Sequence, residues 1–83
     1  MRRCLIGTSR CGTAAIHYYL LTEDREDGLL ECYGILVTCG ADMEMIRNIT
    51  VSQSAILQLL EILIHGTVTP VSLRDVLEDW LLV

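Results

Sequence analysis

The sequence predicts an α+β domain in which a three-stranded antiparallel β-meander precedes two α-helices packed on one of its faces (βββαα). Extended runs rich in β-branched and aromatic residues fill the first part of the chain, and apolar residues at helical spacing fill the last part. The connections between the extended runs are short, which favours antiparallel neighbours. With 83 residues and one proline, the chain is expected to form a single domain, 1–83.

The segment before the first expected strand, residues 1–13, mixes Gly, Ser, Thr and Arg without a clear period. We therefore expect it to form an arm that is at most partly ordered. The first strand is expected over residues 14–22, which are rich in β-forming side chains. A polar turn closed by glycine follows at residues 23–28.

Two further strands are expected after this turn. The second covers residues 29–39, and the isolated Gly34 within it indicates a bulge or the close approach of another backbone. Residues 40–42 turn the chain again, and the third strand covers residues 43–49. These three strands complete the predicted meander.

The hydrophobic period changes to that of a helix after residue 49. Thr50 stands three residues before Gln53, the spacing of a capping box, and Gly66 suits the left-handed position that often follows a helix. A helix is therefore expected to run to about His65. One narrow polar stripe follows this helix: Ser54, Gln58, Glu61 and His65. Its other residues are nearly all aliphatic, so we expect it to be buried on more than one side.

A second helix is expected near the end of the sequence. Ser72 and Asp75 repeat the capping-box spacing. Its apolar residues fall at i, i+3, i+4, i+7 and i+8: Leu73, Val76, Leu77, Trp80 and Leu81. This single regular stripe assigns Trp80 to the intramolecular core.

The charge and composition of the chain argue against several classes of function. Eleven acidic residues face six arginines and no lysine, and the net charge of −5 argues against nucleic-acid binding despite Arg2, Arg3 and Arg10. No apolar run is long enough to cross a bilayer, and Gly7 to Arg10 interrupt any signal-peptide apolar region. Four cysteines without such a signal predict a reducing, cytoplasmic setting.

The expected strands are apolar on both of their faces, whereas a solvated sheet face should alternate with polar residues. A second chain would cover the surplus apolar surface of the sheet and of the first helix. We therefore predict a homodimer or a complex with a protein partner. The residues expected at this contact are Tyr19, Leu21, Tyr33, Ile35 and Leu57.

The cysteines are the other candidate for chemistry. Cys4 and Cys11 are seven residues apart, as are Cys32 and Cys39, which is not a zinc-site spacing. A hairpin closing near Arg25 would bring Cys11 close to Cys39 and Cys32 close to His17. Three interpretations stay open: scattered packing thiols, a Cys11–Cys39 disulfide or thiol switch, and a metal site. The metal candidates are Cys4, Cys11, Cys32, Cys39 and His17.

No set of residues in the sequence points to catalysis. No serine stands in a nucleophile-elbow motif, and the six glycines are too dispersed to cradle a phosphate. His65 lies at a helix end one turn after Glu61. The helix dipole and the Glu61 carboxylate favour a cation at this position, so the histidine has a structural role there. The favoured hypothesis is a non-catalytic protein-interaction module without cofactor or small-molecule ligand. The alternative is a thiol-based redox sensor or metal-binding protein.

Three segments of the chain carry a resemblance to a known family. They are Tyr33-Gly34 in the second expected strand, Asn48-Ile49-Thr50 before the first helix, and the run from Val68 to Leu81. Over residues 16–82, the chain resembles a family of short bacterial proteins of unknown function. The resemblance implies a small cytosolic protein and brings no activity, cofactor or catalytic residue. It leaves the segment with Cys4 and Cys11 outside the similarity.

Overall fold

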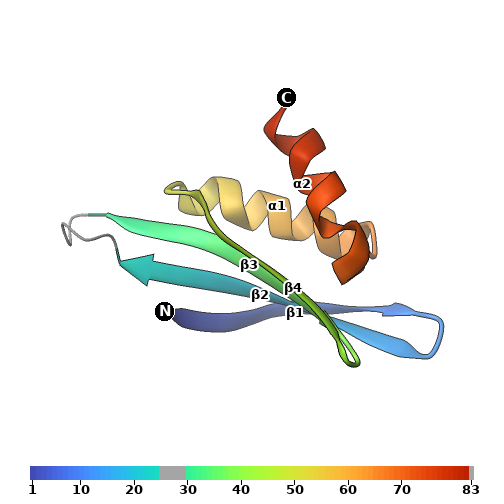
Figure 1. Ribbon diagram of the computed structural model, residues 1–83. Helices are drawn as coiled ribbons and strands as arrows, with labels where there is room; N and C mark the ends of the chain where they lie inside the picture. Colours follow the sequence, from blue (N-terminus) through green and yellow to red (C-terminus); the bar gives the residue numbers. More distant parts are fainter. Residues whose placement is uncertain (25–29, 83) are drawn as a thin grey trace.

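Four antiparallel strands and two helices make up the fold in the computed structural model (Figure 1), which describes residues 1–24 and 30–82. The strands lie in one sheet in chain order: β1 (Arg2–Cys11), β2 (Ala14–Asp24), β3 (Glu31–Cys39) and β4 (Asp42–Thr50). They are followed by α1 (Gln53–His65), the 3₁₀ turn η1 (Pro70–Ser72) and α2 (Leu73–Leu81). The predicted α+β class, with an antiparallel sheet and two helices, is confirmed.

The predicted number of strands is wrong, because the expected arm is a strand. β1 pairs with β2 from Arg2 opposite Thr22 to Cys11 opposite Ala14. Gly12 has a φ of 63° and opens the two-residue turn between them, at the position where a type II′ hairpin requires glycine. β1 is an edge strand with an irregularity before Gly7, so it shows no clean apolar alternation. No alternation of apolar and polar residues in the sequence therefore marks β1 as a strand.

The register between β2 and β3 differs from the expected one. Tyr18 lies opposite Val37, and Leu20 lies opposite Ile35, so these four side chains share one face of the sheet. The expected register instead placed residues whose numbers sum to about 50 opposite one another. In the observed register the numbers of paired residues sum to 55, as for Asp24 with Glu31. Residues 25–28 of the expected turn, and Leu29 of the expected second strand, lie outside the described residues.

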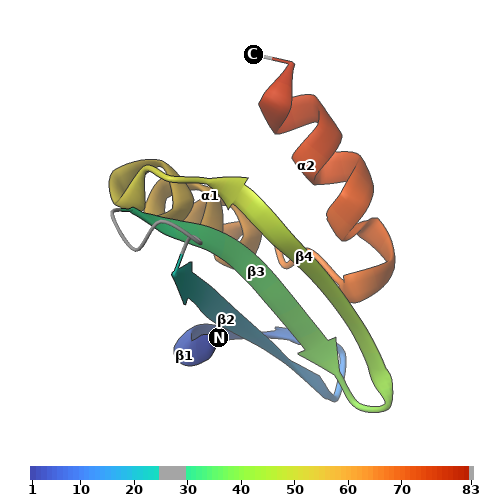
Figure 2. The same cartoon turned by 60° about the vertical axis from the view of Figure 1, so that its left-hand side comes forward.

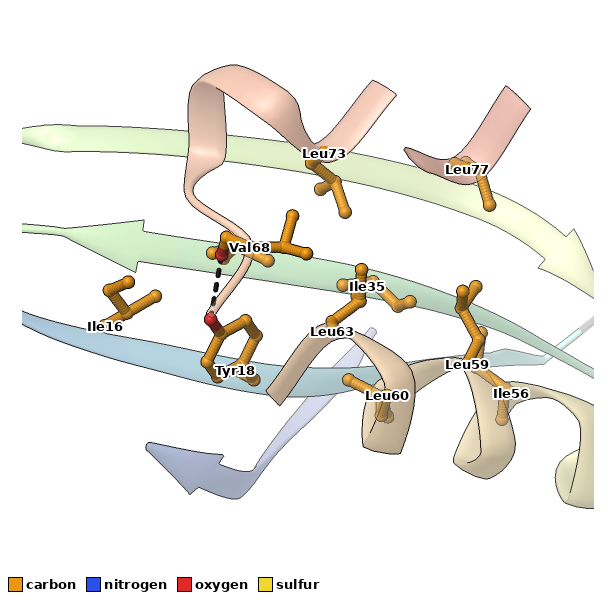
Figure 3. Close-up of a cluster of buried hydrophobic side chains, with 11 residues drawn as sticks. Ile16, Tyr18, Ile35, Ile56, Leu59, Leu60, Leu63, Val68, Leu73 and Leu77 are labelled. Carbon is orange, nitrogen blue, oxygen red and sulfur yellow. Dashed lines mark hydrogen bonds between the residues drawn. The ribbon is translucent and has the colours of Figure 1, made fainter. Parts of the chain in front are cut away.

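The core lies between the sheet and the helices, which cover the same face (Figures 1 and 2). From the sheet it contains Ile16, Tyr18, Ile35 and Val37, and from α1 it contains Ile56, Leu59, Leu60 and Leu63. All eight side chains are fully buried. Figure 3 shows the hydroxyl of Tyr18 directed at the carbonyl of Val68, to which it donates a hydrogen bond of 2.8 Å. This bond ties β2 to the segment after α1.

The capping residues of helix α1 differ from the expected ones at both ends. Ser52 is its N-cap and accepts a hydrogen bond from the Ala55 amide at 3.2 Å, whereas the Thr50 hydroxyl accepts from the Ser52 amide. The capping residue is therefore Ser52 rather than Thr50. Gly66 keeps a right-handed φ of −83°, and the following residue, Thr67, takes the left-handed φ of 52°. The helix does end at His65, as expected.

Helix α2 covers the whole apolar stripe expected from Leu73 to Leu81, but η1 precedes it. Ser72 makes no side-chain capping bond, because η1 continues directly into α2. Leu73 and Leu77 are buried in the core, and Trp80 packs against it while remaining partly exposed. The prediction that Trp80 serves the intramolecular core is confirmed.

Candidate interaction surface

The sheet has a second face that no helix covers in the described chain. Side chains opposite one another on neighbouring strands share a face, so the strand register fixes its composition. One row crosses all four strands: Leu5, Tyr19, Leu36 and Met45. The adjacent row also crosses all four: Thr8, His17, Thr38 and Met43. We call these eight residues together with Leu21 the open face.

The open face is apolar along the row of Leu5, Tyr19, Leu36 and Met45, carries Thr8, His17 and Thr38 in the adjacent row, and is partly closed by its own side chains. Leu36 at its centre has no exposed surface, although it lies outside the core cluster, because Tyr19 and Met45 flank it on the neighbouring strands. Around this centre, Leu5 keeps 50% of its surface exposed and Met43 keeps 59%. The face is therefore an apolar layer whose accessible surface lies mainly on the outer strands.

An ion pair crosses the sheet at one end of the open face. The Arg47 guanidinium on β4 donates two hydrogen bonds of 2.6 Å to the Glu23 carboxylate on β2. These bonds hold the pKa of the Glu23 carboxyl below its ordinary value and raise the pKa of Arg47. Neither row of the open face contains a carboxylate or guanidinium, and the two arginines on this side of the sheet, Arg3 and Arg10, lie on the edge strand outside the rows.

Gly34 allows the arrangement at this end of the sheet. A Cβ atom on Gly34 would lie 2.5 Å from the Ile46 carbonyl oxygen and 2.9 Å from the Arg47 Cα atom. The register of β3 with β4 shifts between Tyr33 and Ile35. The predicted close approach of another backbone to Gly34 is thus confirmed. The bulged backbone of β4 passes over this glycine at Arg47.

The five predicted contact residues do not share one surface. Tyr19 and Leu21 lie on the open face, but Leu21 is only 1% exposed. Ile35 is fully buried in the core, and Tyr33 packs against that core, because both point to the helix side. Their assignment to the same sheet face as Tyr19 is wrong and follows from the register error. The fifth, Leu57, is an exposed residue of α1.

Helix α1 does not present a second apolar face. The predicted polar stripe is exposed along its whole length: Ser54, Gln58, Glu61 and His65. Leu57 and Ile62 are also exposed, but helical geometry places them on opposite sides of this stripe. The sheet buries the rest of the helix, so the expected cover on more than one side is not needed. The surplus apolar surface belongs to the sheet.

Several residues of the open face carry no clear signal in the sequence. Leu5 falls in the expected arm, and no pattern gives Met43 or Met45 a role. The glycine at position 12, followed by an extended run, was the available signal for a hairpin that includes Leu5. With β1 paired to β2, the alternation on β2 assigns Leu5 to the same face as Tyr19.

The structure separates the cysteines instead of gathering them. Cys4, Cys11 and Cys39 occupy the helix side of the sheet, and Cys32 occupies the other side. Cys11 and Cys39 lie on strands either side of β2, about 9.6 Å apart by strand spacing, which exceeds the Cα separation of about 4.4–6.8 Å that a disulfide needs. All four thiols are free. The expected proximity of Cys11 to Cys39 is therefore wrong, and the strand order does not bring the two thiols together for the disulfide that the sequence left open.

His17 also lies away from the cysteines. Cys32 pairs with Glu23, six residues along β2 from His17, which corresponds to roughly 20 Å. The expected proximity of Cys32 to His17 is therefore wrong. The imidazole is half-buried and stacks on the Tyr19 ring with centroids 6.5 Å apart. In residues 1–24 and 30–82, no three His, Cys, Asp or Glu side chains are grouped in a way that could hold a metal ion.

A comparison with known protein families identifies the family of this chain. None of the helices in the described residues has the length and apolar content needed to cross a bilayer. Comparison with curated proteins and with solved structures finds no match. Residues 4–83 match a family of unknown function, DUF6514. This match includes Cys4 and Cys11, so the segment that carries them is not outside the similarity. The chain therefore belongs to the DUF6514 family.

Proposed function

We propose that the protein is a non-catalytic interaction module that forms a homodimer through its open face. The observation that carries this proposal is the apolar row Leu5, Tyr19, Leu36 and Met45, which crosses the whole sheet without a covering helix. An antiparallel sheet exposed to water on one face normally carries polar residues there. An apolar face is instead typical of a surface that another chain covers.

The size of the open face supports a second copy as its occupant. Four strands about 4.8 Å apart and roughly 30 Å long present about 600 Å² of projected area. Two such faces together bury about 1,200 Å², which reaches the lower end of specific protein–protein interfaces. The two crossing rows carry no carboxylate or guanidinium, so a face packed on its own copy brings no like charges together at its centre.

The proposal is tested by placing a charge on the open face and measuring the oligomeric state. Leu5→Arg and Met43→Arg change side chains that are already half exposed, so the monomer fold is retained. Sedimentation velocity at micromolar concentration should show a dimer for the wild type and a monomer for both variants. Val71→Arg is the matched control, because Val71 is 82% exposed on η1 at the helix side, and this variant should remain dimeric.

Two results would overturn this proposal. One is a wild-type protein that sediments as a monomer at micromolar concentration. The other is a dimer that survives both open-face variants but dissociates in Val71→Arg. Circular dichroism of each variant separates loss of dimer from loss of fold.

A further inference from the structure

β1 is an edge strand with one unpaired side. Within residues 1–24 and 30–82, β2 is its only strand neighbour, and Figure 2 shows β1 at the border of the sheet. Eight of its ten residues are exposed. An edge strand presents a row of backbone N–H and C=O groups that another extended chain can pair with. This edge borders the open face and shares Leu5 with it.

The charge of β1 is opposite to that of the rest of the molecule. Residues 1–11 contain Arg2, Arg3 and Arg10 and no acidic residue, although the chain as a whole carries a charge of −5. The exposed acidic side chains of the helices lie on the other layer of the molecule: Glu61, Asp75, Glu78 and Asp79. β1 is therefore a basic edge on an acidic protein, and electrostatic attraction at this edge favours an acidic partner.

A second copy of β1 is a poor partner for this edge. A symmetric antiparallel pair of β1 strands centred between Ile6 and Gly7 places Arg3 opposite Arg10 of the second copy, and both side chains lie on the same side of the sheet. Like charges directly opposite one another destabilise a strand pair. The same arginines attract a strand that carries carboxylates at the matching positions. The charge pattern thus selects against self-pairing and for an acidic segment.

The middle and the start of β1 add further requirements on the partner. Leu5 and Ile6 are 50% and 39% exposed between the arginines, at the irregularity in the strand.

At the start of β1, a cleft of about 400 Å³ adjoins the edge. Its lining residues are Arg2, Arg3, Cys4, Leu20, Thr22, Glu31, Tyr33 and Gln53. Arg2 in this cleft already pairs with Glu31, whereas Arg3 and Arg10 make no ion pair within the described chain.

We propose that β1 accepts an extended segment of another protein as a fifth strand, and that this segment has an aliphatic centre flanked by acidic residues. Backbone hydrogen bonds along β1 supply the pairing, and the carboxylates face Arg3 and Arg10. The irregularity before Gly7 limits continuous pairing to Arg2–Leu5 on one side and Gly7–Cys11 on the other. This inference names a partner class for the interaction module proposed above, and it rests on the backbone edge of β1, which a dimer packed through the side chains of the open face does not pair.

Binding is tested with two fluorescein-labelled peptides of equal charge. The first is Glu-Thr-Glu-Val-Ile-Val-Glu-Thr-Glu, and the second has both valines replaced by proline, which removes two backbone donors and disfavours strand pairing. Fluorescence anisotropy should show that the first peptide binds and that the proline peptide binds at least about tenfold more weakly. Equal affinity of the two peptides, or no binding of the first, would overturn the inference.

A charge-reversed variant locates the site on β1. Arg10→Glu should weaken binding of the acidic peptide by about three- to tenfold, since an exposed ion pair is worth about 0.2–1 kcal/mol and the reversal adds repulsion. The matched control, Arg74→Glu, changes the net charge equally but lies on α2, and it should bind like the wild type. Equal weakening by both variants would show non-specific attraction and would contradict the proposed site.

The peptide assay and the dimer assay fail independently. A monomeric wild type that binds the acidic peptide would remove the open-face dimer and leave the β1 site intact. A dimer that does not bind the peptide would remove the β1 site and leave the dimer intact.

Discussion

Tyr18 is the residue that links the sheet to the segment between the helices. Its ring is fully buried among core side chains, and its hydroxyl donates to the Val68 carbonyl at 2.8 Å. The sequence predicts a strand at Tyr18 but indicates no partner for its hydroxyl. A buried hydroxyl with a backbone partner stabilises the fold, because losing that bond leaves a carbonyl unpaired in the core.

We expect Tyr18→Phe to lower the free energy of unfolding by about 1–2 kcal/mol at neutral pH. Denaturant unfolding measures this change. Tyr19→Phe is the control, because it removes a hydroxyl from the other face of the same strand and leaves the bond to Val68 intact. A Tyr18→Phe protein as stable as the wild type would show that the bond to Val68 does not support the fold.

The same residue predicts how stability depends on alkaline pH. Burial raises the pKa of the Tyr18 phenol above its ordinary value of 10.0, with smaller contributions from Cys39 and Cys11. The folded protein therefore holds this proton more tightly than the unfolded chain. Its contribution to stability is complete below about pH 10 and is lost as the pH rises through the folded pKa. Unfolding measured across this range should show a shallower decline for Tyr18→Phe than for the wild type, and equal slopes would contradict the assignment.

The four cysteines are expected to behave as independent thiols. Cys4 and Cys11 are exposed, whereas Cys32 and Cys39 are half-buried. Because accessibility contributes to thiol reaction rates, an aromatic disulfide reagent should modify Cys4 and Cys11 faster than the other two. Mass spectrometry of the intact protein should show four free thiols. A monomer that has lost two hydrogens to an internal disulfide would contradict the strand order, which keeps β2 between Cys11 and Cys39.

At the scale of elements, the bulge of β4 over Gly34 sets the end of the sheet. The Cβ atom of an alanine there would meet backbone atoms of Ile46 and Arg47, which cannot move without disturbing the strand pair. We expect Gly34→Ala to lower the free energy of unfolding by about 1–3 kcal/mol. Gly7→Ala is the matched control, because its nearest atom is the flexible end of the Ile64 side chain at 2.7 Å. Thermal unfolding should therefore rank Gly34→Ala as the more damaging change, and the reverse order would contradict the bulge.

The elements that the sequence predicts well are those whose pattern is read locally. α2 was recognised because apolar residues repeat at helical spacing from Leu73 to Leu81, and the helix covers this whole stripe. The strand expected over residues 29–39 was also recognised, and β3 differs from it only in beginning at Glu31. β1 was missed because an edge strand with exposed side chains needs no apolar alternation. Its only local signal was the turn at Gly12.

The register between β2 and β3 could not be read locally. It depends on where the chain turns between them, and several polar residues there suit a turn equally well. The error in register put Ile35 on the wrong face and brought Cys11 and Cys39 together. Tyr19 and Leu21 were nevertheless assigned correctly to one side, because alternation along a single strand survives a register error. Two of the nine residues of the open face, Tyr19 and Leu21, were therefore accessible from sequence.

At the scale of the whole molecule, the sheet separates two different surfaces. Its helix side holds a core of fully buried aliphatic residues, so α1 and α2 need no further cover. Its other side is apolar with exposed Leu5 and Met43, and its border is the basic strand β1. This layering accounts for an apolar second face on the strands of a small acidic domain. It also places a dimer contact on the open face beside a partner contact along the backbone edge of β1.

The most direct test of the open-face dimer is an isotope-filtered NOE experiment on a one-to-one mixture of labelled and unlabelled protein. The dimer predicts intermolecular NOEs that involve the methyl groups of Leu5, Met43 and Met45, which lie on the outer strands of that face. Intermolecular NOEs confined to Val71, Leu81 and other helix-side residues would contradict it. The absence of any intermolecular NOE in a protein that sediments as a monomer would contradict it equally.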